Sequence, residues 1–371
     1  FKIHILAKST VRFNAAALAE FWPDLRQRVN TYFAENNLDK KGDHRLYIKT
    51  AVMISVFLSG VVMLYLIPTT PGWIILAYTI IGLGQAGTGL SVMHDALHGS
   101  YSGHKWLNRL MQFSMPLIGG NRTTWKIQHN VNHHTYTNIY RLDEDIDDKP
   151  FLRLSPHGEW KPHHRFQHIY AWGLYCFAVL AWLYRKDFAQ LSNYRKAGMP
   201  ARLGYNHNKV LRRMIIAKAL FISFLLILPV VNGMPLVWAV TGFILSHMLS
   251  GLLISVIFQL AHVVESTEHD HIPSSGQMQH SWAVQQLRTT ANFAVNNPWV
   301  TWLTGGLNHQ VEHHLFPTIS HVHYPAISHI VRETASQYGL PYHHNEGFWK
   351  AVASHTRTLR KFGNAVPVAA Q

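Results

Sequence analysis

The sequence predicts an all-α integral membrane protein in which four transmembrane helices form two hairpins beneath a cytosolic helical cap. Three observations lead to this fold. Four apolar stretches are long enough to cross a bilayer, basic residues crowd the segments on one side of them, and three histidine clusters lie between or after them. Because neutral imidazole is a common ligand of transition metals, we expect the cap to hold a metal site.

The four apolar stretches cover residues 46–67, 72–92, 214–231 and 235–258. Each is close to the length of about 20 apolar residues with which a helix spans the hydrocarbon core. The short links within each pair carry no charge, whereas basic residues crowd the segment before the first pair and the segment before the second. The positive-inside rule therefore places both links outside and the basic segments in the cytosol.

A fifth apolar segment, 169–183, is shorter than the other four and has histidine and arginine near its ends. If it crossed the bilayer, the third histidine cluster would face the side opposite to the first two. We therefore predict that it lies in the cytosolic interface as a re-entrant or amphipathic helix. A true fifth span is the alternative, since the length is borderline.

These elements form one predicted catalytic domain. A cytosolic N-terminal segment, 1–45, contains an amphipathic helix at 24–36 with Leu25, Val29 and Phe33 on one side. The first hairpin, 46–93, is followed by the cap, 94–213, with two histidine clusters and the interfacial helix. The second hairpin, 214–258, is followed by a cytosolic region, 259–371, with the third cluster.

The composition bears on two features, a nucleic-acid partner and an internal disulfide. Lysine and arginine total 33 against 19 acidic residues, giving a net charge of +14. Because the basic residues lie beside apolar spans and form no basic groove with interleaved aromatics, we expect no nucleic-acid partner. The single cysteine, Cys176, excludes an internal disulfide.

The histidine clusters carry the functional prediction. His94 and His98 are four residues apart, as are His129 and His133, and positions 310, 313 and 314 also share one face of a helix. On an α-helix His134 points away from His133, so it could bind a different metal ion. With the histidine that ends the fourth span, the candidate metal ligands are His94, His98, His129, His133, His134, His262, His313 and His314.

Eight histidines exceed the three or four protein ligands of a mononuclear site and therefore predict two metal ions. Carboxylates often hydrogen-bond to ligating imidazoles, and Asp95 and Glu312 lie inside the clusters, so we assign them this role. The acidic run at 143–148 is more simply interpreted as a solvated loop.

The three clusters resemble the histidine boxes of the membrane-bound fatty acid desaturases. His94–His98 matches the first box, the HNVNHH run at 129–134 matches the second, and QVEHH at 310–314 matches the third. Glutamine at the start of the third box is typical of the front-end branch, which includes delta-6, linoleoyl-CoA-type enzymes. Many eukaryotic members carry a fused cytochrome b5 domain, whose His-Pro-Gly-Gly haem motif this sequence does not contain.

The resemblance implies a fatty acid desaturase that uses two iron ions and O2 to introduce a cis double bond into an acyl chain. The eight histidines would ligate the irons. Gln310 would bind iron weakly, bind it through water, or only hydrogen-bond, and His309 is a possible substitute. Gln259 would orient a water. Electrons would come from a separate ferredoxin or cytochrome b5, for which a basic cytosolic face is suited.

Several alternatives remain open from the sequence. Di-iron hydroxylases and sphingolipid desaturases share histidine boxes, and a histidine-rich metal transporter is a more distant alternative that predicts ionisable residues in mid-membrane. The acyl carrier could be CoA, a membrane lipid or a carrier protein, and the double-bond position and oligomeric state are undetermined. With no organelle signal and no cytochrome b5 motif, the sequence favours a bacterial inner membrane over the endoplasmic reticulum.

Overall fold

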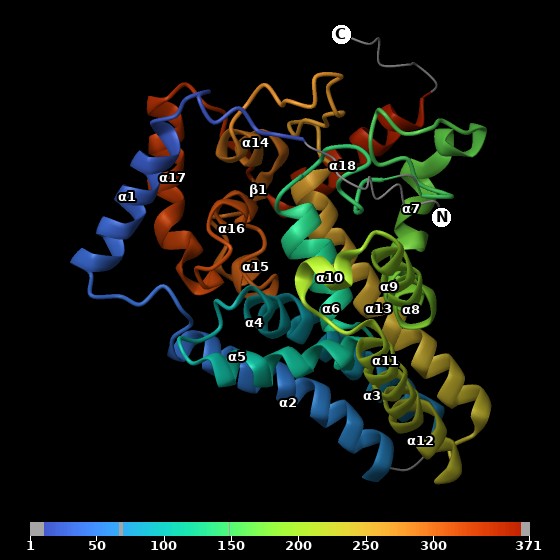
Figure 1. Ribbon diagram of the computed structural model, residues 1–371. Coiled ribbons are helices and arrows are strands. Elements are labelled where there is room, and N and C mark those ends of the chain that lie inside the picture. The colour runs from blue at the N-terminus through green and yellow to red at the C-terminus, as the bar shows by residue number, and fades with distance from the viewer. Residues whose placement is uncertain (1–10, 67–69, 148, 365–371) are drawn as a thin grey trace. The chain divides into compact units, whose positions relative to one another are not determined.

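The computed structural model describes residues 11–66, 70–147 and 149–364 (Figure 1). The end of the first predicted span and the start of its link, 67–69, and Asp148 of the acidic run lie outside these ranges. Chain contacts divide the protein into two compact units. The first contains Phe1–Asp43, Ile127–Ala171 and Ile257–Gln371, and the second contains His44–Lys126 and Trp172–Val256.

The four predicted spans are confirmed as long apolar helices. They run from His44 to Leu66, from Pro71 to His98, from His207 to Val231 and from Leu236 to His262. The second and fourth are longer than predicted, because each helix continues beyond its apolar stretch to a histidine, and the third begins at His207 in place of Met214. Apolar side chains on these helices are widely exposed, for example Leu66 at 78% and Val237 at 64%, as expected for surfaces that face lipid.

Two of the spans change helix type along their length, and the other two are single α-helices. The elements are α2 (His44–Leu66), α3 (Pro71–Gly87) continued by the π-helix η1 (Thr88–Met93) and α4 (His94–His98), α11 (His207–Ile222) continued by the π-helix η6 (Ser223–Ile227) and α12 (Leu228–Val231), and α13 (Leu236–His262).

The first hairpin is tightly packed. Helices α2 and α3 lie side by side (Figure 1), and small residues let their backbones approach. Phe57 of α2 and Ile81 of α3 join Phe221 and Phe243 of the second helix pair in one buried cluster. The hydroxyl of Tyr78 donates a hydrogen bond to the carbonyl oxygen of Leu225, which ties α3 to the third span.

The remaining helices of the second unit are short. They are α5 (Lys105–Met111), the 3-10 helix η2 (Gln112–Ile118), α6 (Arg122–Trp125), α8 (Ala178–Ala181), the π-helix η5 (Trp182–Lys186), α9 (Asp187–Lys196) and α10 (Met199–Leu203).

The predicted interfacial segment 169–183 belongs to a pair of helices, Pro162–Cys176 and Ala178–Lys196, that are bent by 61° at a short break. Such a bend is compatible with a re-entrant helix and with a broken fifth span. Its position in the interface therefore stays a prediction.

The first unit is also helical. Its elements are α1 (Phe21–Glu35), the π-helix η3 (Lys126–His133), the 3-10 helix η4 (Pro162–Phe166), α7 (Gln167–Cys176), α14 (Trp282–Thr289), β1 (Ala291–Phe293), α15 (Pro298–Leu303), α16 (Gln310–Leu315), the 3-10 helix η7 (His321–His323), α17 (Tyr324–Gln337), β2 (His343–Asn345) and α18 (Phe348–Gly363). The two strands are parallel, with Ala291 opposite His343.

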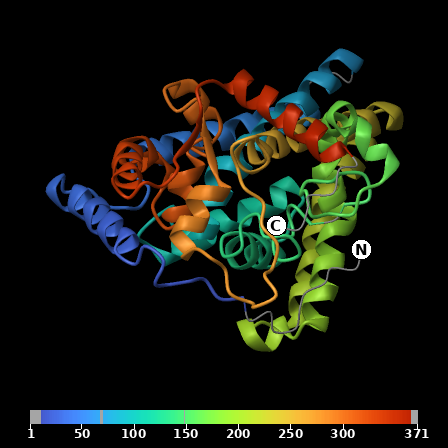
Figure 2. The same cartoon turned by 90° about the horizontal axis from the view of Figure 1, so that it is seen from above.

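The predicted amphipathic helix near the N-terminus is confirmed as α1, which lies along α17 in both views (Figures 1 and 2). It begins before Pro23, which is tolerated in a first helical turn. Its buried residues Leu25, Val29 and Phe33 pack in one core with Val311 of α16 and other residues of this unit. This core fixes the helix that carries the third histidine cluster.

Each predicted region is one continuous stretch of sequence, whereas each compact unit combines stretches that are separate in the sequence. The first histidine cluster, placed by prediction in the cap, packs in the unit that contains the first hairpin. The physical reason is that His94 and His98 continue the helical backbone of the second span without a break.

Gly84 makes the tightest backbone contact between α2 and α3. A Cβ atom there would lie 2.5 Å from the backbone N and Cα of Phe57, so the two helices must separate. We expect Gly84→Ala to destabilise the protein by about 1–3 kcal/mol, measured as a lower unfolding temperature in detergent. Gly72→Ala on the same helix meets nothing within 4 Å and is the matched control. Equal unfolding temperatures of both variants would contradict the prediction.

Candidate metal centre

Six of the eight predicted metal ligands gather in the first unit, where all are buried. They come from η3, the residue after η3, the end of α13, and α16: His129, His133, His134, His262, His313 and His314. Segments that are more than a hundred residues apart in the sequence therefore converge on one cluster of imidazoles.

The centre of this cluster is a triangle of rings. The ring centroids of His133, His262 and His314 are 4.7, 4.8 and 4.9 Å apart in pairs. One nitrogen from each ring lies within 4.8 Å of the others, which is a spacing that a single metal ion can bridge.

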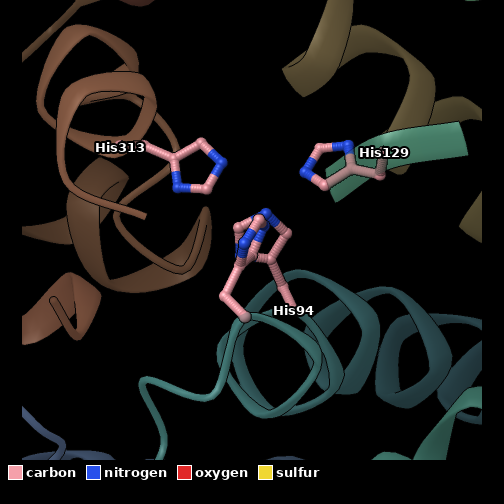
Figure 3. A group of neighbouring side chains, drawn as sticks. His94, His129 and His313 are labelled. Atoms are coloured by element: carbon pink, nitrogen blue, oxygen red, sulfur yellow. The ribbon is translucent and has the colours of Figure 1, made fainter. Parts of the chain in front are cut away.

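A second group shares one member with the first. His134, His313 and His314 also have ligand nitrogens within 4.8 Å of one another. The ring of His134 lies 4.4 Å from that of His314 and 4.6 Å from that of His313. The rings of His313 and His129 stack 5.9 Å apart and point toward each other (Figure 3). The two groups overlap at His314 and together contain five histidines, and whether they hold two ions stays a prediction.

The second histidine cluster has a geometry that α-helical spacing does not give. Residues 126–133 form a π-helix, and the backbone N–H of His134 donates to the carbonyl oxygen of His129, five residues back. The wider turn brings His134 Nε2 to 3.2 Å from His129 Nε2. The expectation that His134 points away therefore does not hold, because it assumed 3.6 residues per turn.

Asp143 is buried, and the interpretation of 143–148 as a solvated loop is wrong at this position. Its side chain is fully buried, and Oδ2 lies 2.9 Å from Nδ1 of His133. Asp145 lies 3.8 Å from the same nitrogen. Burial alone would lower the pKa of His133, but the charge and hydrogen bond of Asp143 raise it above the ordinary value.

His314 is oriented by side chains that the sequence analysis missed. Its Nδ1 lies 2.8 Å from Oε1 of Gln286, which also accepts a hydrogen bond from the hydroxyl of Thr137. Since the amide oxygen can only accept, Nδ1 carries the proton and Nε2 keeps its lone pair for a metal. Only the position of Thr137, four residues after His133, could have suggested this contact from the sequence.

The orphaned nitrogens of His133 and His314 identify the metal side of each ring. In both, Nδ1 is hydrogen-bonded and Nε2 is buried without a hydrogen-bond partner among the described residues. An unsatisfied buried nitrogen is costly, and a metal ion would satisfy it. Burial, with four neighbouring histidines, also lowers the pKa of His314 well below its ordinary value, which favours the neutral ligand form.

Glu312 is buried on α16 within the third cluster. Its carboxylate accepts hydrogen bonds from Asn292 and from the hydroxyl of Tyr342, each at 2.8 Å. Complete burial raises the pKa of Glu312 to about 7. Nδ1 of His309 lies 3.8 Å from this carboxylate, and burial lowers the pKa of His309 to about 4. His309 belongs to none of the metal-compatible groups found among the described residues, so the geometry does not favour it as a substitute ligand.

Gln310 is placed at the cluster. Its amide nitrogen lies 3.0 Å from Nε2 of His262. The carbonyl oxygen of His262 accepts a hydrogen bond from Asn138, a buried residue with a φ of +55°. Gln259 is 7% exposed, with an unpartnered side-chain oxygen among the described residues.

The other two predicted ligands lie in the second unit. His94 (Figure 3) and His98 are on the short helix α4, with ring centroids 4.7 Å apart. Both rings meet the ring of Trp125 edge to face, at 5.8 and 5.7 Å. Asp95 is buried, with Oδ1 at 3.8 Å from Nδ1 of His94. The i,i+4 spacing therefore places the two imidazoles together, as predicted.

Comparison with known proteins gives consistent results. The family described as "Fatty acid desaturase" matches residues 68–346. The sn-1 linoleoyl-lipid 6-desaturase of Synechocystis sp. is 34% identical over 92% of this chain and 95% of its own length. The protein of the same name from Arthrospira platensis is 33% identical over 92% of each chain. The acyl-lipid (8-3)-desaturase of Physcomitrium patens is 28% identical over 96% of this chain and 74% of its own.

The contact between His133 and Asp143 can be tested by removing charge. Besides the contact with His133, Asp143 accepts hydrogen bonds from the backbone N–H groups of Asn138 and Asp145. In asparagine one of the two oxygens becomes an NH2 group, which is itself a donor and would face at least one of these donors. We expect Asp143→Asn to weaken metal binding about 10–100-fold, measured by competition with a chelator. Asp24→Asn, on α1 and paired with Arg28, is the control. Unchanged affinity in Asp143→Asn would show that the carboxylate does not support the site.

Proposed function

This chain belongs to the fatty acid desaturase family, and on that premise we propose that it introduces a cis double bond into an acyl chain that is already unsaturated, on the carboxyl side of the existing double bond. The observation that carries the proposal is the buried imidazole cluster, in which the Nδ1 atoms of His133, His313 and His314 each lie beside a side-chain oxygen and leave Nε2 for a metal. The chain is thus an oxidoreductase of the front-end type, and the details that follow are proposals.

We propose that the metal centre is a pair of iron ions held by His94, His98, His129, His133, His134, His262, His313 and His314. The two overlapping histidine groups around His314 support two ions in place of one. His94 and His98 are assigned to the same centre by their motif and by their position on the last turn of the second span, where His94 is buried and His98 is half-buried. Gln310, beside His262, binds one iron weakly, binds it through water, or only hydrogen-bonds.

The residues present suit iron chemically. Imidazole is a ligand of intermediate softness that iron accepts, and the site contains no thiolate. With O2 and two electrons, the bound irons would supply the oxidising power to remove two hydrogens from neighbouring methylenes. The overall reaction balances as one saturated C–C bond, O2, two electrons and two protons giving one double bond and two waters.

The protein's own residues hold the centre in one geometry. The hydrogen bonds of Asp143 to His133 and of Gln286 to His314 fix two ring planes before any metal is bound. The Tyr324 hydroxyl, 3.1 Å from Nδ1 of His313, supports a third. Burial of all six imidazoles of the first unit keeps bulk water from a reactive centre.

We propose a lipid-linked linoleoyl chain as substrate and the sixth carbon as the position of the new double bond. The support is the name of the Synechocystis and Arthrospira relatives, sn-1 linoleoyl-lipid 6-desaturase, since both are matched over almost their whole length. The four apolar spans, which place the enzyme in the membrane with its substrate, are compatible with a lipid carrier. CoA and carrier-protein esters are the alternatives that the product assay separates.

We further propose that electrons come from a separate acidic carrier of the ferredoxin or cytochrome b5 type. The excess of 14 positive charges at pH 7 favours an acidic partner. We place the centre on the cytosolic side of a bacterial inner membrane, because the basic segments lie on that side by the positive-inside rule.

The proposed activity is tested by product analysis. A host that expresses this chain and a ferredoxin, fed with saturated, oleic and linoleic acids, should form a new cis double bond at the sixth carbon of linoleoyl lipids. Gas chromatography with double-bond location detects it, and His313→Ala/His314→Ala should remove it. A retained hydroxyl group in place of a double bond would identify a hydroxylase, and a new bond on the methyl side of existing ones would exclude front-end selectivity.

The proposed ligand set predicts the metal content. The purified chain should hold about two irons, and His262→Ala should lose iron and all turnover while its amount in the membrane is unchanged, because it removes one corner of the ring triangle. His271→Ala, an exposed histidine of the same unit, is the matched control. Metal analysis and membrane fractionation measure both. Full iron content in His262→Ala would remove this residue from the ligand set.

A further inference from the structure

A buried ion pair in the second unit has no role in the proposed chemistry. Nζ of Lys218 lies 2.8 Å from Oδ2 of Asp187, and the two side chains are 7% and 0% exposed. Lys218 belongs to the third span and Asp187 begins α9. An ionisable pair this deeply buried in a membrane protein is a candidate for a functional role.

The pair is fully hydrogen-bonded. Besides Asp187, Nζ of Lys218 donates to the carbonyl oxygens of Gly119 at 2.7 Å and Trp182 at 3.0 Å. The second carboxylate oxygen of Asp187 accepts a hydrogen bond from the hydroxyl of Thr124 at 2.5 Å. The network therefore joins five segments: α11, the end of η2, η5, α9 and α6.

Thr124 connects this network to the first histidine cluster. The next residue, Trp125, presents the ring that both His94 and His98 contact edge to face. The same indole packs in a buried cluster with Met93 and Leu97, the residues that precede His94 and His98. Helix α6 has only four residues, so its position depends on tertiary contacts more than on its own backbone hydrogen bonds.

Stability alone does not account for such a pair. Replacing a buried ion pair by apolar residues of similar volume is often neutral or stabilising, whereas the charged pair holds its partners in one geometry. Here the geometry that it fixes is that of Thr124, and through Trp125 that of two imidazole rings.

We propose that Lys218, Asp187 and Thr124 are positioning residues for His94 and His98. They hold Trp125 against the two rings, so that the imidazoles are oriented for metal before it binds. This inference rests on the proposed function, since it assigns these histidines to the iron centre.

The test uses the full chain in detergent and the double variant Lys218→Met/Asp187→Leu, which removes both charges together. We expect an unfolding temperature equal to or above that of the unchanged chain, loss of iron to a chelator at least about 10-fold faster, and a kcat at least about 10-fold lower with an unchanged KM for the acyl substrate. A stabilising role alone would lower the unfolding temperature first. A double variant that unfolds at a clearly lower temperature, or one that keeps its iron and its kcat, would overturn the proposal.

A matched pair of single variants refines the test. Thr124→Val removes one hydroxyl from Asp187 and should accelerate iron loss in the same direction, though less. Thr123→Val makes the same change one residue earlier. The backbone N–H of Thr123 donates to Oδ1 of Asn121, and the substitution keeps this bond, so the variant should behave as the unchanged chain. Equal iron loss in both variants would also overturn the proposal. An unchanged chain that holds no iron and forms no product would instead overturn the proposed function, and this inference with it.

Discussion

The site depends on buried imidazoles whose ring direction is set by a hydrogen bond to Nδ1, as in His133 and His314. His314 lies within 5 Å, ring to ring, of His133, His134 and His262, a density that charged rings could not tolerate. Burial keeps His314 neutral, and Gln286 decides which nitrogen faces inward. The core beneath α16 and the long helix that ends at His262 hold the rings of this unit in place.

Departures from α-helical geometry bring ligands into position. The π-helix at 126–133 turns His134 back toward His129, and the π-helix at 88–93 directly precedes His94. Such wide turns leave an irregular backbone and are frequent at functional sites. At 126–133 the structural consequence is that two histidines five residues apart, His129 and His134, meet.

Rigid supports carry the proposed ligands. His94 and His98 end one long helix and His262 ends another, so their backbone positions follow from spans that the membrane itself stabilises. Ligands on such helices are held more closely than ligands on loops. The buried pair of Lys218 and Asp187 adds a polar constraint in the second unit, where apolar packing alone would permit small shifts.

The sequence by itself determined the four spans, the membrane class and which histidines are candidate metal ligands, because hydropathy and i,i+4 spacing are properties of the local sequence. It also placed the amphipathic helix α1. It did not reveal Asp143, Gln286 or the direction of His134. Asp143 is buried against the ring of His133, Gln286 meets His314 across 28 residues, and the π-helix at 126–133 replaces the spacing on which the prediction relied. Which nitrogen of each ring is held, and by what, was decided by tertiary structure alone, since hydrogen-bond partners depend on which segments converge.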